Sequence, residues 1–395
     1  RIQGRLFPIC VYFILYDTFL KIVSKPLIPI DNIKPDDFFN TNKQKSISPY
    51  KFEISRVCNM LTGINAKLRY ISSGSTGHFF KGVILNDIHK PVNDKDNIKC
   101  YFGLKLTPYL KCSKYHTIYD INRPENTELN MLKCLSYFVM SGQTRHLILP
   151  VQSFFCPIHE FVKMMEFNKI IDSKQKYQKF ITDYKADKYE NIVSVLISEL
   201  ASEGDFLNYI RINKDKIKPI HWKIFFFQLL SVLAVIQSRF PNFRHNDLKA
   251  NNILLHKTKK ICRNSYIINK KQYVTPPFNL LLKMWDFDFA CIPGYVDNIK
   301  VHENWTKEIN ITTKQNRYYD IHFFFTTLQM FFPLITNPNY SGLETVNFIN
   351  DVVPEYYKSN KTTATEKGRL LIDVEYTTPL KLLETHPYFE EFRVK

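Results

Sequence analysis

The chain carries its most specific pattern at His245-Asn246-Asp247-Leu248-Lys249-Ala250-Asn251-Asn252-Ile253-Leu254-Leu255. An Asp and an Asn stand five residues apart directly before an apolar run, as expected where a polar loop enters a short buried strand. A second acidic turn, Trp285-Asp286-Phe287-Asp288-Phe289, follows the apolar run Leu280-Leu281-Leu282. Two acidic turns that leave adjacent strands can share one metal site.

This spacing is that of the kinase catalytic loop, in which the Asp receives the proton of the acceptor hydroxyl and the Asn holds a metal ion. Asp247 and Asn252 occupy these two positions. The Asp of a D-F-G element binds metal in kinases, and Asp286 is the matching residue. An isolated Asp and Asn in a polar loop usually form a turn or a helix cap. The length of the match favours phosphoryl transfer instead.

The composition is that of a globular protein long enough for two lobes. The chain has 395 residues, 45% of them apolar and 15% aromatic, with a formal net charge of +17. This charge favours acidic partners such as a nucleotide, a phosphoprotein, anionic lipid or nucleic acid. The basic residues are spread widely and select none of these, so we predict no specific nucleic-acid binding. The eight cysteines form no C-x-x-C pair, which indicates reduced thiols in a cytosolic setting and no zinc site.

Residues 1–64 are expected to form an N-terminal extension. The segment from Leu6 to Val23 is apolar enough to raise the question of a membrane anchor. A spanning helix needs roughly 20 predominantly apolar residues, and Pro8, Asp17 and Lys21 interrupt this run. Packing of the segment on the catalytic domain is therefore the favoured interpretation.

A phosphate-binding loop is expected at Ile71-Ser72-Ser73-Gly74-Ser75-Thr76-Gly77-His78-Phe79-Phe80-Lys81, between two strand signals. Gly74 and Gly77, with Ser75 and Thr76 between them, would let the backbone approach phosphates closely. The first Gly and the final Val of the kinase pattern G-x-G-x-x-G-x-V are replaced here. Taken alone, the loop is explained equally well as a plain hairpin turn.

A lysine within an apolar strand follows, at Tyr101-Phe102-Gly103-Leu104-Lys105-Leu106. Burying an ammonium group is costly unless it is paired, and kinases pair such a lysine with the nucleotide phosphates and with a Glu on the next helix. Residues 127–135 show apolar residues at helical spacing, which makes Glu128 the leading partner and Glu125 the alternative. Lys105 could instead be an edge residue that snorkels to water.

The stretch Ser198-Glu199-Leu200-Ala201-Ser202-Glu203-Gly204-Asp205-Phe206-Leu207 resembles a kinase hinge. Adenine would bond to the backbone of Glu199 and Ala201. Asp205 stands where a carboxylate commonly meets the ribose, although an Asp at this boundary suits a helix N-cap nearly as well. Residues 225–235 then predict a long buried helix that leads into the catalytic loop.

Two insertions are expected. Residues 163–191 lie between predicted strands at 146–155 and 192–196, and their many Lys, Tyr and Asp residues without strand alternation indicate a helix and a mobile surface excursion. Residues 256–279 hold a group of basic side chains beside the active-site strands: Lys257, Lys259, Lys260, Arg263, Lys270 and Lys271. An acidic substrate or a membrane surface could dock there; a solvated hairpin whose lysines blunt an edge strand is the equal alternative.

Together these motifs resemble a eukaryotic-type protein kinase. The turn at 285–289, with Asn316-Arg317-Tyr318-Tyr319-Asp320-Ile321-His322-Phe323-Phe324, is similar to the divergent serine/threonine kinase of poxvirus virions and its relatives in other large DNA viruses. The similarity covers roughly residues 65–395. It implies an α+β, two-lobed kinase fold, with a small β-rich N-lobe at 65–198 and a larger helical C-lobe at 199–395.

The resemblance also implies an activity, the transfer of the γ-phosphoryl group of ATP to Ser and Thr hydroxyls of protein substrates. Asp247 would be the catalytic base, Lys249 would neutralise the transferring phosphate, and Lys105 would hold the nucleotide phosphates. Asn252 and Asp286 would bind Mg²⁺, or Mn²⁺ in its place. The implied substrates are viral structural or assembly proteins, met in the host cytoplasm at the viral assembly site and in the virion.

The chain also departs from the kinase pattern. Asn246 replaces the Arg that usually follows the catalytic-loop His, so we expect no basic pocket that reads activation-loop phosphorylation, and activity without it. Arg244 is the residue that could take over this role. Asp288 replaces the Gly of D-F-G and reduces backbone freedom there. Asp320 resembles the buried helix Asp that braces the catalytic-loop backbone.

Two other classes of function compete with this interpretation. A small-molecule kinase of the choline or aminoglycoside type can also carry His-Asn-Asp followed by an Asn, but Lys249 is typical of protein Ser/Thr kinases. A pseudokinase acting as a binding scaffold would be expected to lose one of the four central residues. Lys105, Asp247, Asn252 and Asp286 are all present.

Overall fold

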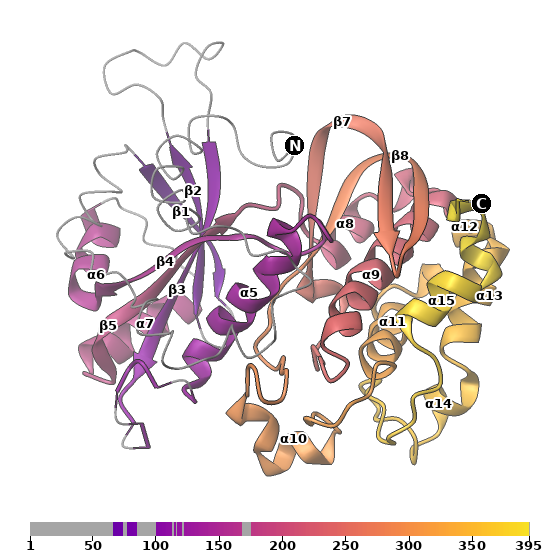
Figure 1. Ribbon diagram of the computed structural model, residues 1–395. Helices are drawn as coiled ribbons and strands as arrows, with labels where there is room; N and C mark the ends of the chain where they lie inside the picture. The colour runs from indigo at the N-terminus through magenta and orange to yellow at the C-terminus, as the bar shows by residue number, and fades with distance from the viewer. Residues whose placement is uncertain are drawn as a thin grey trace. The chain divides into compact units, whose positions relative to one another are not determined.

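The structure is a computed structural model that describes residues 66–73, 77–84, 100–112, 114–115, 117–120, 122–167 and 175–394. The expected N-terminal extension, with its apolar segment, lies outside the described residues, as do Gly74, Ser75 and Thr76 of the expected phosphate loop. The chain divides into two compact units: one takes the residues up to Asp120 with Leu149–Leu200, and the other takes Ile121–Ile148 with Ala201–Lys395. The first is an antiparallel sheet with helices and the second is mainly helical (Figure 1), as the predicted two-lobed α+β fold requires.

The first unit is built on a five-stranded antiparallel sheet in the order β1-β2-β3-β5-β4. Its strands are β1 (Ala66–Ser73), β2 (His78–Ile84), β3 (Cys100–Leu110), β4 (Pro150–Pro157) and β5 (Tyr189–Glu199). Because side chains alternate between the two faces of a strand, every second residue enters the core. Leu68, Phe80, Leu104, Leu106 and Val195 are among these buried side chains.

Two helices, α6 (Ile158–Phe167) and α7 (Gln175–Lys185), lie between β4 and β5 in the chain. Within the insertion expected at 163–191, the structure describes the end of α6, the helix α7 and the start of β5, so the expected helix is present. Residues 168–174 lie outside the described residues, and a surface excursion stays a prediction. Phe161 of α6 and Phe180 of α7 are buried in the core of the sheet.

The second unit is organised around α9 (Pro219–Arg239), the buried helix expected from residues 225–235. It is long and apolar enough to cross a membrane, but most of its apolar window is buried against the rest of its own unit, as in the core helix of a soluble domain. The other helices are α5 (Pro124–Met140), α8 (Phe206–Ile212), α10 (Asn304–Glu308), α11 (Tyr319–Phe331), α12 (Pro338–Ser341), α13 (Leu343–Val352), α14 (Glu355–Ser359) and α15 (Pro379–Thr385).

The strand that follows the catalytic loop, β7 (Ile253–Ile268), forms a long antiparallel hairpin with β8 (Lys271–Met284). The short strand β6 (Gly204–Asp205) pairs with Leu254 and Leu255 at the start of β7. Asn269 and Lys270 form the tip of the hairpin, both with positive φ, which is the geometry of a type I′ turn. Figure 1 shows the hairpin curving over the helices of its unit. The expected insertion at 256–279 is therefore a continuation of two strands.

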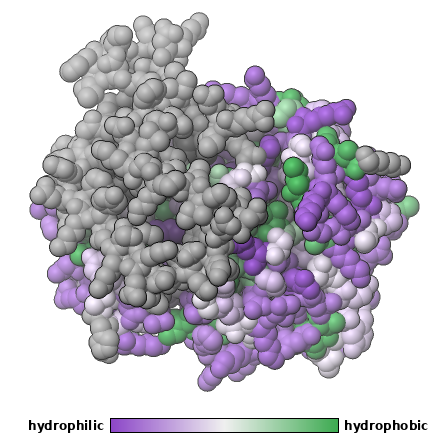
Figure 2. All heavy atoms as spheres, viewed as in Figure 1, coloured by the Kyte–Doolittle hydropathy of each residue, from purple (hydrophilic) through white to green (hydrophobic). Residues whose placement is uncertain are grey.

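The distal half of the hairpin is amphipathic. Tyr266 and Tyr273 are buried and both pack against Phe227 of α9, whereas Arg263 and Ile267 are exposed. Hydrophilic residues prevail in the part of the visible face that lies over this hairpin (Figure 2). The hairpin alternative is thus present with its basic residues exposed, but one face of its distal half packs in the hydrophobic core, which was not expected from the sequence.

Candidate active site

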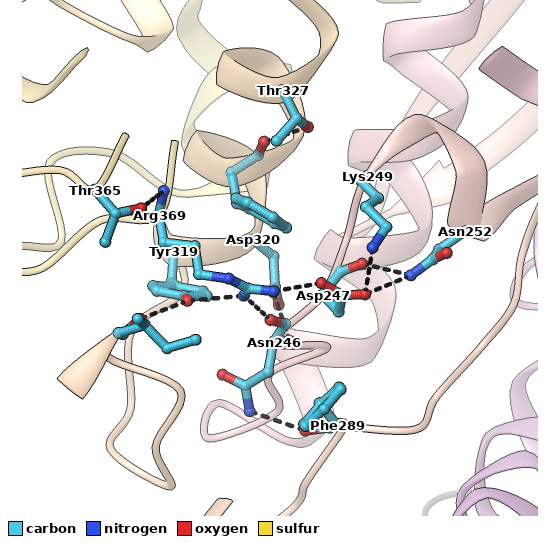
Figure 3. A network of polar contacts seen from close by, with 12 residues as sticks. Asn246, Asp247, Lys249, Asn252, Phe289, Tyr319, Asp320, Thr327, Thr365 and Arg369 are labelled. Atoms are coloured by element: carbon cyan, nitrogen blue, oxygen red, sulfur yellow. Dashed lines mark hydrogen bonds and ion pairs between the residues drawn. The ribbon is translucent and has the colours of Figure 1, made fainter. Parts of the chain in front are cut away.

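The catalytic loop leaves α9 and enters β7 through a single turn of 3₁₀ helix, Ala250–Asn252. Its central carboxylate, Asp247, is buried. Oδ2 of Asp247 accepts hydrogen bonds from Lys249 Nζ at 2.8 Å and from Asn252 Nδ2 at 2.9 Å (Figure 3). Asn252 Nδ2 also donates to the Asp247 carbonyl at 2.8 Å. The loop therefore brings together three of the residues that the sequence singles out.

Asp320 of α11 fixes the backbone of this loop. Its carboxylate is completely buried and accepts from the N–H of His245 at 2.7 Å and from the N–H of Asn246 at 2.9 Å. Burial raises the pKa of Asp320, while the His245 ring, Arg244 and the two N–H donors act in the opposite direction. Asn246 has φ +63°, a left-handed conformation that Asn tolerates better than most residues. The bracing role expected of Asp320 is confirmed.

The second acidic turn is tied directly to the catalytic loop. Trp285 N–H donates to the carbonyl of Asn252 at 3.1 Å. Asp286 is the next residue, so a backbone hydrogen bond links the segments that carry the two predicted metal ligands, Asn252 and Asp286. Phe287 is buried against the His245 ring, with centroids 5.1 Å apart. The residues on both sides of Asp286 therefore contact the catalytic loop, Trp285 through its backbone and Phe287 through its ring.

The oxygen atoms around this link fit a hard divalent ion. The amide nitrogen of Asn252 faces Asp247, which leaves Oδ1 of Asn252 for another partner. Asp286 is half-buried, and no other described residue gives its carboxylate a hydrogen bond or ion pair. Amide and carboxylate oxygens are ligands that Mg²⁺ prefers, usually together with substrate phosphates. Asn252 and Asp286 could therefore hold such an ion.

The segment between Asp286 and α11 is anchored by protein groups. Arg244 is completely buried and donates to Thr312 Oγ1 at 2.9 Å and to the Asn310 carbonyl at 2.6 Å. Asn246 Nδ2 donates to the Phe289 carbonyl at 3.0 Å. Asp288, at the Gly position of D-F-G, accepts from Lys300 Nζ at 2.5 Å. These bonds tie the segment to the catalytic loop and to its own Lys300.

Arg369 reaches the same loop and was missed in the sequence. It lies 122 residues beyond Asp247 and donates from Nη2 to Asp247 Oδ1 at 2.5 Å. Nη1 of Arg369 donates to the Asn246 carbonyl, also at 2.5 Å. No local pattern marks this arginine; the preceding Gly368, with φ +82°, indicates only a turn.

In the first unit, Gly77 directly precedes β2 and lies beside Lys105 of β3. A Cβ at Gly77 would stand 2.5 Å from the Leu106 carbonyl oxygen and 3.3 Å from Lys105 Cε. Glycine is therefore required at this position, and the Lys105 stem runs past the end of the expected phosphate loop. Glu199 ends β5, where its N–H donates to the Leu149 carbonyl at 3.0 Å. The Glu199 carbonyl accepts from Ser198 Oγ at 3.2 Å, and an adenine contact at Glu199 stays a prediction.

The remaining predicted residues belong to the second unit. Asp205 is the N-cap of α8, since its Oδ1 accepts from Asn208 N–H at 2.8 Å; the helix-cap interpretation is confirmed, and a ribose contact stays a prediction. Ala201 is half-buried at the start of this unit. Glu128 is buried on α5. Because Lys105 belongs to the other unit, its pairing with Glu128 also stays a prediction.

Comparisons with known proteins point to the same chemistry. Residues 57–377 match the family model described as Poxvirus serine/threonine protein kinase. The chain is 40% identical over 383 residues to a protein of Acanthamoeba polyphaga mimivirus provisionally named serine/threonine-protein kinase R400, an alignment that covers 93% of this chain and 77% of that protein. It is 25% identical over 255 residues to serine/threonine-protein kinase 2 of Fowlpox virus (strain NVSL), covering 61% of this chain and 52% of the relative.

Proposed function

Because the chain belongs to the poxvirus serine/threonine protein kinase family, we propose that it transfers the γ-phosphoryl group of ATP to Ser and Thr hydroxyls of protein substrates. The observation that carries the proposal is the contact of Asp247 with Lys249 and Asn252 in a loop braced by Asp320. A carboxylate held in this way can accept the proton of an incoming hydroxyl, and an adjacent ammonium can balance the charge of the phosphoryl group.

Other residues of the chain would bind the metal ion and the nucleotide. Asn252 and Asp286 would hold Mg²⁺, or Mn²⁺ in its place, which when bound neutralises phosphate charge. Lys105 would bind the nucleotide phosphates, with Glu128 or Glu125 orienting its ammonium group. The phosphate loop and the hinge would hold the rest of the nucleotide through Gly74, Ser75, Thr76, Gly77, Glu199, Ala201 and Asp205.

We further propose that the substrates are viral structural or assembly proteins, phosphorylated in the host cytoplasm at the assembly site and in the virion. Membership of the poxvirus family supports the viral setting. The exposed basic side chains of Lys257, Lys259, Lys260 and Arg263 on β7 would attract an acidic segment of a substrate or an anionic membrane surface. A small-molecule kinase is not favoured, because the matched family and the named relatives are protein kinases.

The test is a phosphorylation assay with purified protein, radiolabelled ATP and Mg²⁺ on a panel of acceptors. The panel holds basic and acidic proteins, choline and an aminoglycoside, and labelled protein is hydrolysed for phosphoamino-acid analysis. The proposal predicts phosphoserine and phosphothreonine. Label on choline or the aminoglycoside alone, or on tyrosine alone, would contradict it.

A further inference from the structure

We propose that Arg369 is a positioning residue of the catalytic centre, which orients the Asp247 carboxylate and supplies the cation that the catalytic loop lacks at Asn246. The inference rests on the proposed role of Asp247 as the base. Its starting point is that a side chain from a distant part of the chain touches the reacting carboxylate directly. The segment that carries it, between α14 and α15, matches none of the motifs identified in the sequence.

The guanidinium group of Arg369 completes the set of donors around Asp247. Nη2 of Arg369 holds Oδ1 at 2.5 Å, while Lys249 and Asn252 hold Oδ2 (Figure 3). Charge-assisted bonds of this kind are roughly twice as strong as neutral ones. The same guanidinium also grips the Asn246 carbonyl, so one side chain fixes both the carboxylate and the backbone before it.

Arg369 is itself held in place. Nη1 donates to Tyr319 Oη at 3.2 Å, and Cζ lies 4.2 Å from the centroid of the Phe323 ring, a cation–π contact. Only 12% of the side chain is exposed. A planar guanidinium can make these contacts at once, whereas an ammonium group cannot. If Arg369 instead blocked Asp247 and left the site on activation, it would have to break all of these contacts. The geometry therefore favours a positioning role over an inhibitory one.

The backbone around Arg369 is shaped to present it. The Thr365 N–H donates to the Arg369 carbonyl at 2.8 Å, and Thr365 Oγ1 accepts from the Arg369 N–H at 3.0 Å. Gly368 lies in this closed turn with φ +82°, where a Cβ would stand 2.7 Å from Thr326 Cγ2 of α11. The adjacent Leu370 is completely buried. The turn is thus packed against α11, the helix that also carries Asp320.

Tyr319 links Arg369 to the segment before α11. Its hydroxyl accepts from Arg369 and donates to the Ile309 carbonyl at 3.3 Å. The Arg244 guanidinium lies 3.8 Å from the centroid of the Tyr319 ring. Two arginines therefore converge on one tyrosine, and both are tied to the catalytic loop or to the segment after it. These two cations hold the catalytic loop and the segment after it in one arrangement.

The experiment compares Arg369→Gln and Arg369→Lys with the unmodified protein in steady-state phosphorylation of a protein acceptor. Because small misplacements of a catalytic group can cost on the order of 10²-fold, we expect kcat to fall by roughly 10- to 100-fold in Arg369→Gln while KM for ATP changes by less than about 3-fold. Arg369→Lys should recover only part of the loss, and guanidinium at millimolar concentration should rescue Arg369→Ala.

The matched control is Arg317→Gln, which removes a guanidinium from the nearby Glu375 ion pair without touching the catalytic loop. It should leave kcat within about 2-fold of the unmodified protein. Arg369→Gln with normal or raised kcat, or Arg369→Ala without rescue in a folded sample, would overturn the inference. If the unmodified protein phosphorylated no acceptor, the proposed function would fall first, and this inference with it.

Discussion

At the scale of single residues, the catalytic carboxylate is held by side chains from two distant parts of the chain. Lys249 and Asn252 stand within a few residues of Asp247, and their spacing let the sequence predict them. Asp320 follows from resemblance to a family. Arg369 could not be predicted, because a contact over 122 residues leaves no local pattern. Local spacing thus predicted two of the side chains that contact Asp247 but not the third, Arg369.

His322 gives a prediction for stability against pH. Burial lowers its pKa to about 4, and Nε2 contacts the Tyr357 carbonyl at 2.8 Å, so the native ring is neutral and donates. An unfolded His binds a proton below about 6.5. Stability from this group is therefore present above pH 6.5 and is lost as the pH falls toward 4. The loss by pH 5 should be about 2 kcal/mol.

Urea denaturation at pH 7.5, 6 and 5 measures this effect. His322→Gln should be less stable at pH 7.5 but should show a shallower decline toward pH 5 than the unmodified protein. Equal declines in the two proteins would show that other groups cause the acid sensitivity.

At the scale of elements, sequence patterns predicted the helices and strands better than they predicted which of their faces are buried. The buried helix α9 and the strands β3 and β5 were expected because their apolar runs are long and local. The hairpin β7–β8 was one of two open alternatives for residues 256–279, and its basic residues are exposed as that alternative requires, but its core-facing side was not foreseen. The buried alternation of Asn264, Tyr266 and Ile268 was the available sign of a core-facing side.

The turn that carries Arg369 supplies a prediction at this scale. Gly368→Ala places a Cβ at positive φ and against Thr326, so it should destabilise the protein by about 1–3 kcal/mol and lower kcat by displacing Arg369. The control is Gly142→Ala, which has a similar φ of +76° but nothing within 4 Å of the new Cβ. Denaturation and steady-state rates are measured for both.

Gly142→Ala should lose stability through φ alone and keep its kcat. If Gly368→Ala kept normal turnover despite a comparable or larger loss of stability, the turn would have no part in presenting Arg369 to the loop.

At the scale of the whole molecule, the net charge is +17, yet the two arginines nearest the catalytic loop are bound to groups of the protein itself. Arg244 is bound to the 310–314 segment, and Arg369 is bound to the catalytic loop. Phosphate-dependent ordering normally creates charge-assisted bonds to such arginines. Arg244, which the sequence suggested as a substitute reader of phosphate, already bonds to Asn310 and Thr312.

We therefore predict activity that does not depend on phosphorylation of the kinase itself. Phosphatase-treated protein and autophosphorylated protein, verified by intact mass, should phosphorylate an acceptor at initial rates within about 2-fold of each other. An activation of roughly 10³-fold, equivalent to a coupling of about 4 kcal/mol, would reveal a phosphate reader at another position.

The central claim, that Asp247 is the base of a Ser/Thr protein kinase, is tested most directly by single-turnover transfer of radiolabelled phosphate to a protein acceptor. Asp247→Asn preserves the shape of the side chain but removes its capacity to accept the proton, so ATP binding should persist while transfer falls by roughly 10²- to 10⁴-fold. Transfer to Ser and Thr by the unmodified protein with this loss in the variant is the predicted result. Equal transfer rates in the two proteins would contradict it.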